Sequence, residues 1–122
     1  MTELASVDAY LKGKDAAAVK LFRVFEQMIE RCGSSEPAPR SSIVYWKRKR
    51  VWAGAYIERE RLELNIDLLR EAEHPCGIAA FNTTKRVITH RLRITERDQL
   101  DESIQALLQE AYDDVGPGTR GG

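Results

Sequence analysis

Two histidines and two cysteines are the residues of this chain whose side chains most often carry out chemistry. His74 and Cys76 are separated by a single residue, which is a spacing that two ligands of one metal ion can adopt. A zinc site needs three or four such ligands, and only Cys32 and His90 remain, at unhelpful distances along the chain. We therefore predict no metal and no cofactor. An enzyme or iron-handling protein that uses His90, His74 or Cys76 is kept as the alternative.

His90 belongs to an alternating segment in which it shares a face with Leu92 and Ile94. A histidine in a strand can act as a general base, but beside apolar neighbours we expect it to donate to a backbone carbonyl instead. No serine or cysteine stands in a nucleophile-elbow sequence, and the chain has neither a GxGxxG nor a GxxxxGK[ST] string. The sequence therefore predicts no catalytic residue.

The densest charge in the chain is the run of four basic residues at positions 47–50, which has tyrosine and tryptophan on both sides. Guanidinium and ammonium groups neutralise phosphates, and exposed aromatic rings stack on bases. The alternative interpretation is an edge whose charge only prevents aggregation. Because Tyr45 and Trp46 must point to opposite faces of a strand, one of the aromatic residues belongs to the core. The predicted ligand-binding surface comprises Tyr45, Lys47, Arg48, Lys49, Arg50, Trp52, Arg61, Arg91 and Arg93.

Glu63 and Asp67 lie on the outward face of one predicted strand. Four residues of strand span about 13 Å, which is too far for the two carboxylates to share one metal ion. We expect them to form cross-strand ion pairs with Arg91 or Arg93. Glu63 and His90 are also kept as candidates for a second polar site.

The charges of the chain are segregated along the sequence, although the formal net charge is zero. Residues 1–39 have a balance of −1, residues 40–93 a balance of +6 and residues 94–122 a balance of −5. The middle segment can therefore attract anions locally while the acidic end repels them.

The elements that must position these residues can be read from the periodicity. Apolar residues recur at spacings of three and four after Asp15, which predicts a helix that ends at Gly33. A period of two then predicts strands, and a Thr95–Asp98 capping box precedes a final helix that ends at Gly116. The predicted strands are 42–48, 51–58, 61–68 and 87–94, and residues 69–81 are predicted to be irregular.

This order predicts an α+β fold with a four-stranded, mostly antiparallel sheet and the N-terminal and C-terminal helices packed on one face. Residues 1–116 are expected to form a single domain, and residues 117–122 a flexible glycine-rich tail.

Several short strings carry a family resemblance. Val7–Leu11, the helix after Asp15, the basic hairpin and Thr89–Ile94 leading into residues 101–112 resemble a bacterial family, the domain of unknown function 5655. The layout also resembles small bacterial domains with double-wing or frataxin-like sheets, some of which are linked to iron and others to nucleic acid. The resemblance implies a fold and no agreed activity.

The function predicted from these observations is a non-catalytic binding module. Its basic and aromatic sheet face would take an anionic ligand or a nucleic-acid backbone, and a homodimer formed through that open face is a further alternative. The first residues lack a signal peptide and no apolar run could span a bilayer, so we expect a cytoplasmic protein without a membrane partner.

Overall fold

The computed structural model describes residues 2–119, which form three α-helices, a short 3₁₀ helix and one six-stranded sheet. The sheet order is β1-β2-β3-β4-β6-β5, and every neighbouring pair is antiparallel. The α+β class and the antiparallel sheet are thus confirmed. The elements are α1 Val7–Leu11, α2 Ala16–Cys32, β1 Glu36–Pro39, β2 Val44–Lys47, β3 Val51–Glu58, β4 Arg61–Leu68, β5 Gly77–Asn82, β6 Ile88–Ile94, η1 Arg97–Gln99 and α3 Glu102–Asp114.

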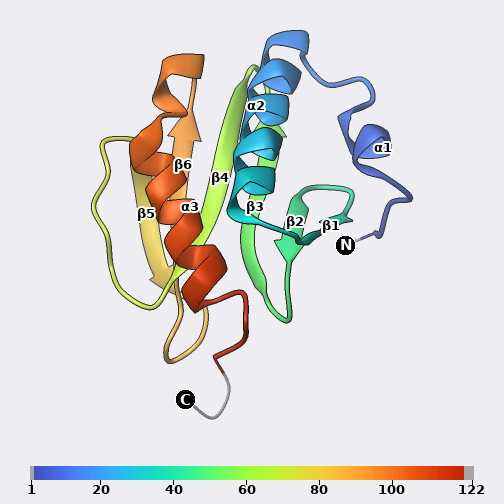
Figure 1. Ribbon diagram of the computed structural model, residues 1–122. Helices are drawn as coiled ribbons and strands as arrows, with labels where there is room; N and C mark the ends of the chain where they lie inside the picture. Colours follow the sequence, from blue (N-terminus) through green and yellow to red (C-terminus); the bar gives the residue numbers. More distant parts are fainter. Residues whose placement is uncertain (1, 120–122) are drawn as a thin grey trace.

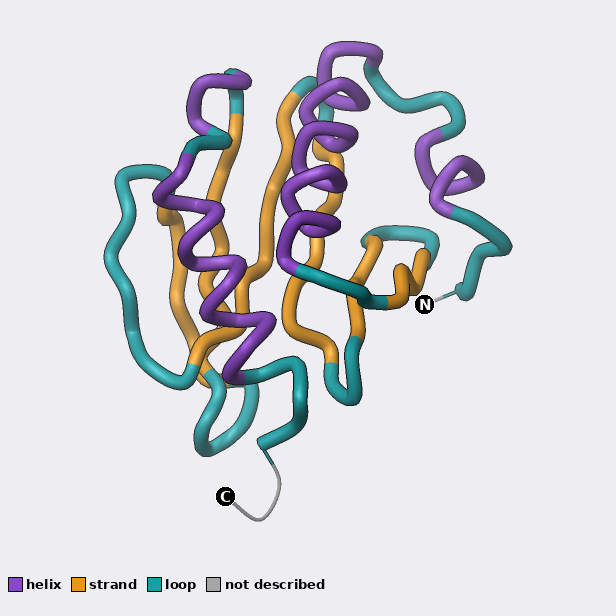
Figure 2. The backbone as a smooth tube through the Cα atoms, viewed as in Figure 1, coloured by secondary structure: helices purple, strands orange, loops and turns teal. Residues whose placement is uncertain are grey.

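The helices α2 and α3 lie side by side across one face of the sheet, and the other face carries no helix (Figures 1 and 2). Between these two layers lies a core that includes Phe22, Phe25, Leu64 and Ile104, all of them fully buried. Leu107 of α3 is only half-buried at the margin of this core. The face without helices is called the open face below.

The prediction of four strands was wrong, because the sheet has six. Strand β1 contains Pro37 and Pro39, which argue against a strand in the middle of a sheet but are tolerated at an edge, where β1 lies. Five of the six residues of β5 lie in the segment 69–81 that we expected to be irregular, and all six are exposed. Exposure on both faces removes the alternation of polar and apolar residues by which a strand is recognised.

The final helix begins later than its capping box predicted. The side chain of Gln99 accepts the amides of Thr95 and Glu96, and the intervening turn is the 3₁₀ helix η1. The N-cap of α3 is Asp101, whose carboxylate accepts the amides of Ser103 and Ile104. The helix capped by Asp15 was predicted correctly, since its carboxylate accepts the amide of Ala18.

Between β4 and β5 the chain crosses over β6, because β5 pairs with the far side of β6 (Figure 1). This crossover, residues 69–76, passes on the helix side, where His74 contacts Ser103 of α3. Of the predicted tail 117–122, residues 120–122 lie outside the described part of the chain. Gly118 donates its amide to the carbonyl of Val115, and the carbonyl of Thr119 accepts from Arg86.

Candidate functional site

The basic hairpin between β2 and β3 packs against the C-terminal end of α3. The guanidinium of Arg48 lies 4.1 Å from the ring centroid of Tyr112 and donates to the Tyr112 carbonyl. The amides of Lys49 and Arg50 both donate to the carbonyl of Gly116. Lys47 and Lys49 have exposed side chains, whereas Arg48 and Arg50 also have structural contacts. The end of α3 is thus fixed by the side chain of Arg48 and by the backbone amides of Lys49 and Arg50.

The prediction that Trp52 belongs to a ligand-binding surface was wrong, because its side chain is fully buried. The register of β2 and β3 shifts between Trp46 and Lys47, so the strict alternation of faces fails at Trp52. Trp52 makes an edge contact with Tyr112 of α3, with ring centroids 5.2 Å apart. Trp46 is buried as well, against Phe22 and Phe25. Both tryptophans are core residues.

The open face nevertheless carries aromatic rings between its arginines. Tyr45 and Tyr56 are half-buried there. Tyr45 pairs with Gly54 of β3, where an added Cβ would approach the Tyr45 ring to 3.2 Å, and Tyr56 lies two residues further along β3. Phe81 of β5 is 44% exposed. Of the predicted aromatic residues, Tyr45 therefore lies on the open face and Trp52 does not. Tyr56 and Phe81, which were not predicted, also lie there.

Two carboxylates of the open face are buried in ion pairs. The predicted cross-strand pair is confirmed for Glu63, which contacts Arg93, but Asp67 pairs with Arg50 and not with Arg91 or Arg93. Glu63 is 1% exposed, and one of its oxygens accepts from Arg93 at 2.9 Å and from Arg61 at 3.4 Å. Its other oxygen, Oε2, is buried without a hydrogen-bond partner among the described residues. Asp67 accepts from Arg50 at 3.0 Å and from the hydroxyl of Thr89 at 2.7 Å. These contacts neutralise three of the four arginines on this face.

Arg91 is the arginine of the open face that no carboxylate neutralises within residues 2–119. Its Nε donates to the neutral amide oxygen of Asn65 at 3.2 Å. Its guanidinium carbon lies 5.6 Å from the ring centroid of Tyr56 and 5.5 Å from that of Phe81. A half-buried guanidinium between two rings is a group that can bind an anion together with a flat apolar surface.

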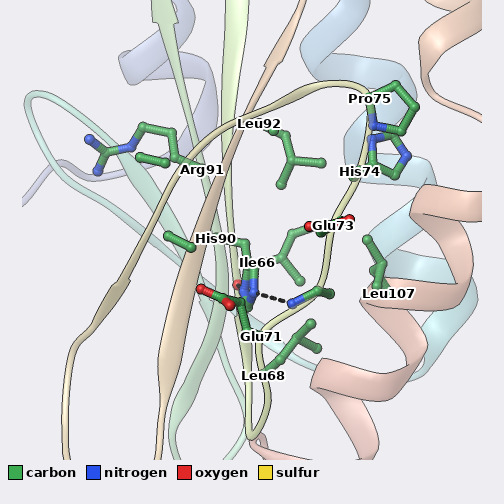
Figure 3. A pocket seen from close by; sticks show the side chains of 14 residues that line it. Ile66, Leu68, Glu71, Glu73, His74, Pro75, His90, Arg91, Leu92 and Leu107 are labelled. Carbon is green, nitrogen blue, oxygen red and sulfur yellow. Dashed lines mark hydrogen bonds between the residues drawn. The ribbon is translucent and has the colours of Figure 1, made fainter.

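The helix side of the sheet has a pocket of about 600 Å³ beside the crossover 69–76 (Figure 3). Polar and apolar groups contribute about equally to its walls, and in Figure 3 the side chain of Arg91 points away from it. Glu71, Glu73 and His74 provide its polar rim. The apolar and histidine side chains that line it are those of Ile66, Leu68, His90, Leu92 and Leu107.

His90 is buried in this wall, and both of its ring nitrogens have backbone partners. Nε2 accepts the amide of Ala72 at 2.9 Å, so Nδ1 carries the proton and donates to the carbonyl of Ile66 at 3.3 Å. This agrees with the expected donation to a backbone carbonyl. The ring holds the crossover to β4 and has no nitrogen left for a substrate. Glu63 lies on the opposite face of the sheet, so the two residues do not form one polar site.

His74 and Ser103 are 2.8 Å apart, which resembles the beginning of a catalytic arrangement. Nδ1 of His74 accepts the amide of Cys76, so in the neutral ring Nε2 carries the proton and donates to the hydroxyl of Ser103. That hydroxyl in turn donates to Asp101 at 2.6 Å. Because the imidazole is the donor, it cannot take the proton of Ser103 in this arrangement. The contact ties the crossover to the N-terminus of α3.

Neither cysteine has the properties of a reactive thiol. Burial raises the pKa of Cys32 to about 11, and it raises the pKa of Cys76 as well, with a smaller contribution from the charge of Asp101. Among residues 2–119 no group of three or more histidine, cysteine, aspartate or glutamate residues is placed to hold a metal ion.

The comparisons with known proteins place the chain in a family. A family model described as a domain of unknown function, DUF5655, matches residues 7–115. The chain belongs to this family. The search of curated proteins and the search of solved structures found no match. The likeness to double-wing and frataxin-like domains therefore stays a prediction.

The structure brings Arg61, Arg91, Arg93 and Glu63 together on the open face, with Tyr45 at its far side. It separates them from Lys47, Arg48 and Lys49, which lie at the hairpin end of the sheet, and Arg50 joins the two groups by reaching Asp67. Sequence reasoning missed Tyr56 and Phe81 as ring partners of Arg91. The alternation of β3 could have identified Tyr56, whereas Phe81 needed the position of β5. Within the described residues no helix has the length and apolar character that crossing a membrane requires.

Proposed function

We propose that this DUF5655 domain is a non-catalytic binding module that takes a phosphate-bearing ligand, most suitably a single-stranded nucleic acid, on the open face of its sheet. The observation that carries the proposal is the environment of Arg91, a guanidinium that lies between the rings of Tyr56 and Phe81 and has no acidic partner within residues 2–119. Phosphates would be neutralised by arginines, and bases would stack on the rings.

The charge of the surrounding face supports this choice of ligand. Three of the four arginines on the open face pair with Glu58, Glu63 or Asp67. Lys47 adds a positive charge, which Glu36, its register partner on β1, offsets. The positive charge that remains is that of Arg91. The acidic residues of the last helix lie on the opposite side of the sheet, where they would not meet a strand bound to the open face (Figure 1). We therefore expect weak, salt-sensitive binding with little sequence preference.

The test is fluorescence anisotropy with labelled single-stranded oligonucleotides of about 12 nucleotides at several salt concentrations. Each neutralised phosphate contributes about 0.7 to the slope of log affinity against log salt for a single strand. The variant Arg91→Gln, which keeps a hydrogen-bonding group beside Asn65, should weaken binding and reduce that slope by about 0.7. Phe81→Ala should weaken binding and leave the slope unchanged, because it removes a stacking surface without charge.

The matched control is Lys20→Gln, which removes one positive charge from an exposed position on α2. Its affinity and salt slope should equal those of the unaltered protein. Inorganic phosphate and mononucleotides serve as competitors that separate a small anionic ligand from a nucleic-acid strand. If the unaltered protein binds none of these ligands at low salt, or if Arg91→Gln binds as well as the unaltered protein, the proposal is wrong.

A further inference from the structure

The two edges of the sheet differ in how well they are protected from a second strand. Strand β1 contains Pro37 and Pro39, which have no amide hydrogen to donate. The chain before α1 also covers this edge, since Leu4 donates its amide to the carbonyl of Pro39 and Glu3 forms a bridge with Arg40. At the opposite edge, β5 has a neighbour on one side only within residues 2–119, and it contains neither proline nor a charged residue.

Strand β5 also carries much of the exposed apolar surface. All six of its residues are exposed, and Ile78 and Phe81 are two of the three large hydrophobic side chains that are exposed within residues 2–119. The third, Leu69, lies in the crossover outside β5. Proteins commonly protect an edge strand with charge, with proline or with a covering segment. The only such protective feature of β5 within residues 2–119 is a β-bulge between Gly77 and Ala79.

The backbone of β5 offers hydrogen-bonding groups to a further strand. Thr83 donates its amide to the carbonyl of Val87, in continuous register with the pairs Asn82–Ile88 and Ala80–His90. The amides of an antiparallel edge strand alternate between the neighbouring strand and the solvent. Because the amide of Thr83 points toward β6, those of Asn82 and Ala80 point away from the sheet.

The charges at the two ends of β5 have opposite signs. Glu71 and Glu73 precede the strand, and Lys85 and Arg86 follow it, all four with exposed side chains. If two copies of β5 pair antiparallel about a two-fold axis, the acidic end of each strand lies beside the basic end of the other. The edge is thus complementary to itself, as a two-fold interface requires.

We propose that two copies of this protein associate through their β5 strands and form one continuous antiparallel sheet. The inference is independent of the ligand that the open face binds. The two open faces would then lie side by side, with the Phe81 side chains close to the junction. Only one short strand from each copy takes part, so the association is weak and depends on protein concentration.

The test is sedimentation velocity over a range of protein concentrations in low-salt buffer. The mean mass should rise from 13.9 kDa toward twice that value. Ile78→Lys places a charge on the edge, and Ala80→Pro removes an outward amide, so both variants should remain monomeric at the same concentrations. Circular dichroism establishes that each variant is folded. Leu69→Lys is the matched control, because it replaces an equally exposed hydrophobic residue outside β5 and should leave the association unchanged.

A charge exchange tests the orientation of the two strands. Glu73→Lys alone and Lys85→Glu alone should each weaken the association, and the double variant should restore it, because opposite charges would again face each other. A parallel arrangement of the strands predicts no such restoration. The proposal is overturned if the unaltered protein stays monomeric at every concentration, if Leu69→Lys disrupts association as much as Ile78→Lys does, or if the double variant is not restored.

Discussion

The guanidinium groups of this protein have three kinds of partner, and the partner determines what each arginine does. Arg93 and Arg61 compensate the buried carboxylate of Glu63, and removal of that carboxylate's partners would leave a buried charge uncompensated. Arg48 donates to a backbone carbonyl and covers an aromatic ring at the end of α3. Arg91 has rings and an amide as partners, so its charge remains available.

The role of Arg48 gives a prediction about stability. Arg48→Ala removes the hydrogen bond to the Tyr112 carbonyl and the contact with its ring, and we expect it to lower the free energy of unfolding by about 1–2 kcal/mol. Lys49→Ala is the matched control, because its side chain is exposed and its amide bond to Gly116 is retained. Urea denaturation measures both variants. Equal stability of the two variants would mean that the side chain of Arg48 has no structural role.

At the level of the elements, α3 is held by contacts at both of its ends and by contacts with the crossover. Asp101 caps its N-terminus, and hydrogen bonds from Ser103 and the helix amides lower the pKa of that carboxyl. Near the other end, Arg70 at the start of the crossover donates two hydrogen bonds of 2.8 Å to Glu110 and lowers the pKa of its carboxyl. The hairpin then holds the turn that follows the helix at Gly116.

The lowered pKa values of Asp101 and Glu110 allow a prediction of how the free energy of unfolding depends on pH. A carboxyl whose pKa is lower in the folded protein stabilises it above the unfolded pKa, and this contribution is lost as the pH falls through the folded pKa. The free energy of unfolding should therefore decrease between about pH 5 and pH 3. In the variant Asp101→Asn with Glu110→Gln the decrease should be smaller, since asparagine keeps the cap without titrating. Urea titrations across this range give the comparison, and an identical pH dependence would contradict it.

For the whole molecule, the helices and the four central strands could be predicted from sequence because each buries one face and leaves a periodic signal. The two edge strands could not be predicted. Strand β1 contains prolines, and β5 is exposed on both faces, so neither has the alternation of polar and apolar residues that indicates a strand. Alternation also decides how much of the site can be predicted. It correctly places Arg61, Arg91, Arg93 and Glu63 on one face of the sheet. It places Trp52 wrongly, because a shift of register reverses alternation locally.

The central claim is that the open face, with Arg91 at its centre, is the ligand-binding surface. The most direct measurement is a titration of the isotope-labelled protein with a single-stranded oligonucleotide, followed by NMR chemical shifts at low salt. The proposal predicts that the largest changes occur on β4, β5 and β6, at Asn65, Phe81 and the backbone and guanidinium signals of Arg91, with α2 unaffected. Changes confined to the hairpin 47–50 or to the pocket beside the crossover, or no changes at all, would contradict it.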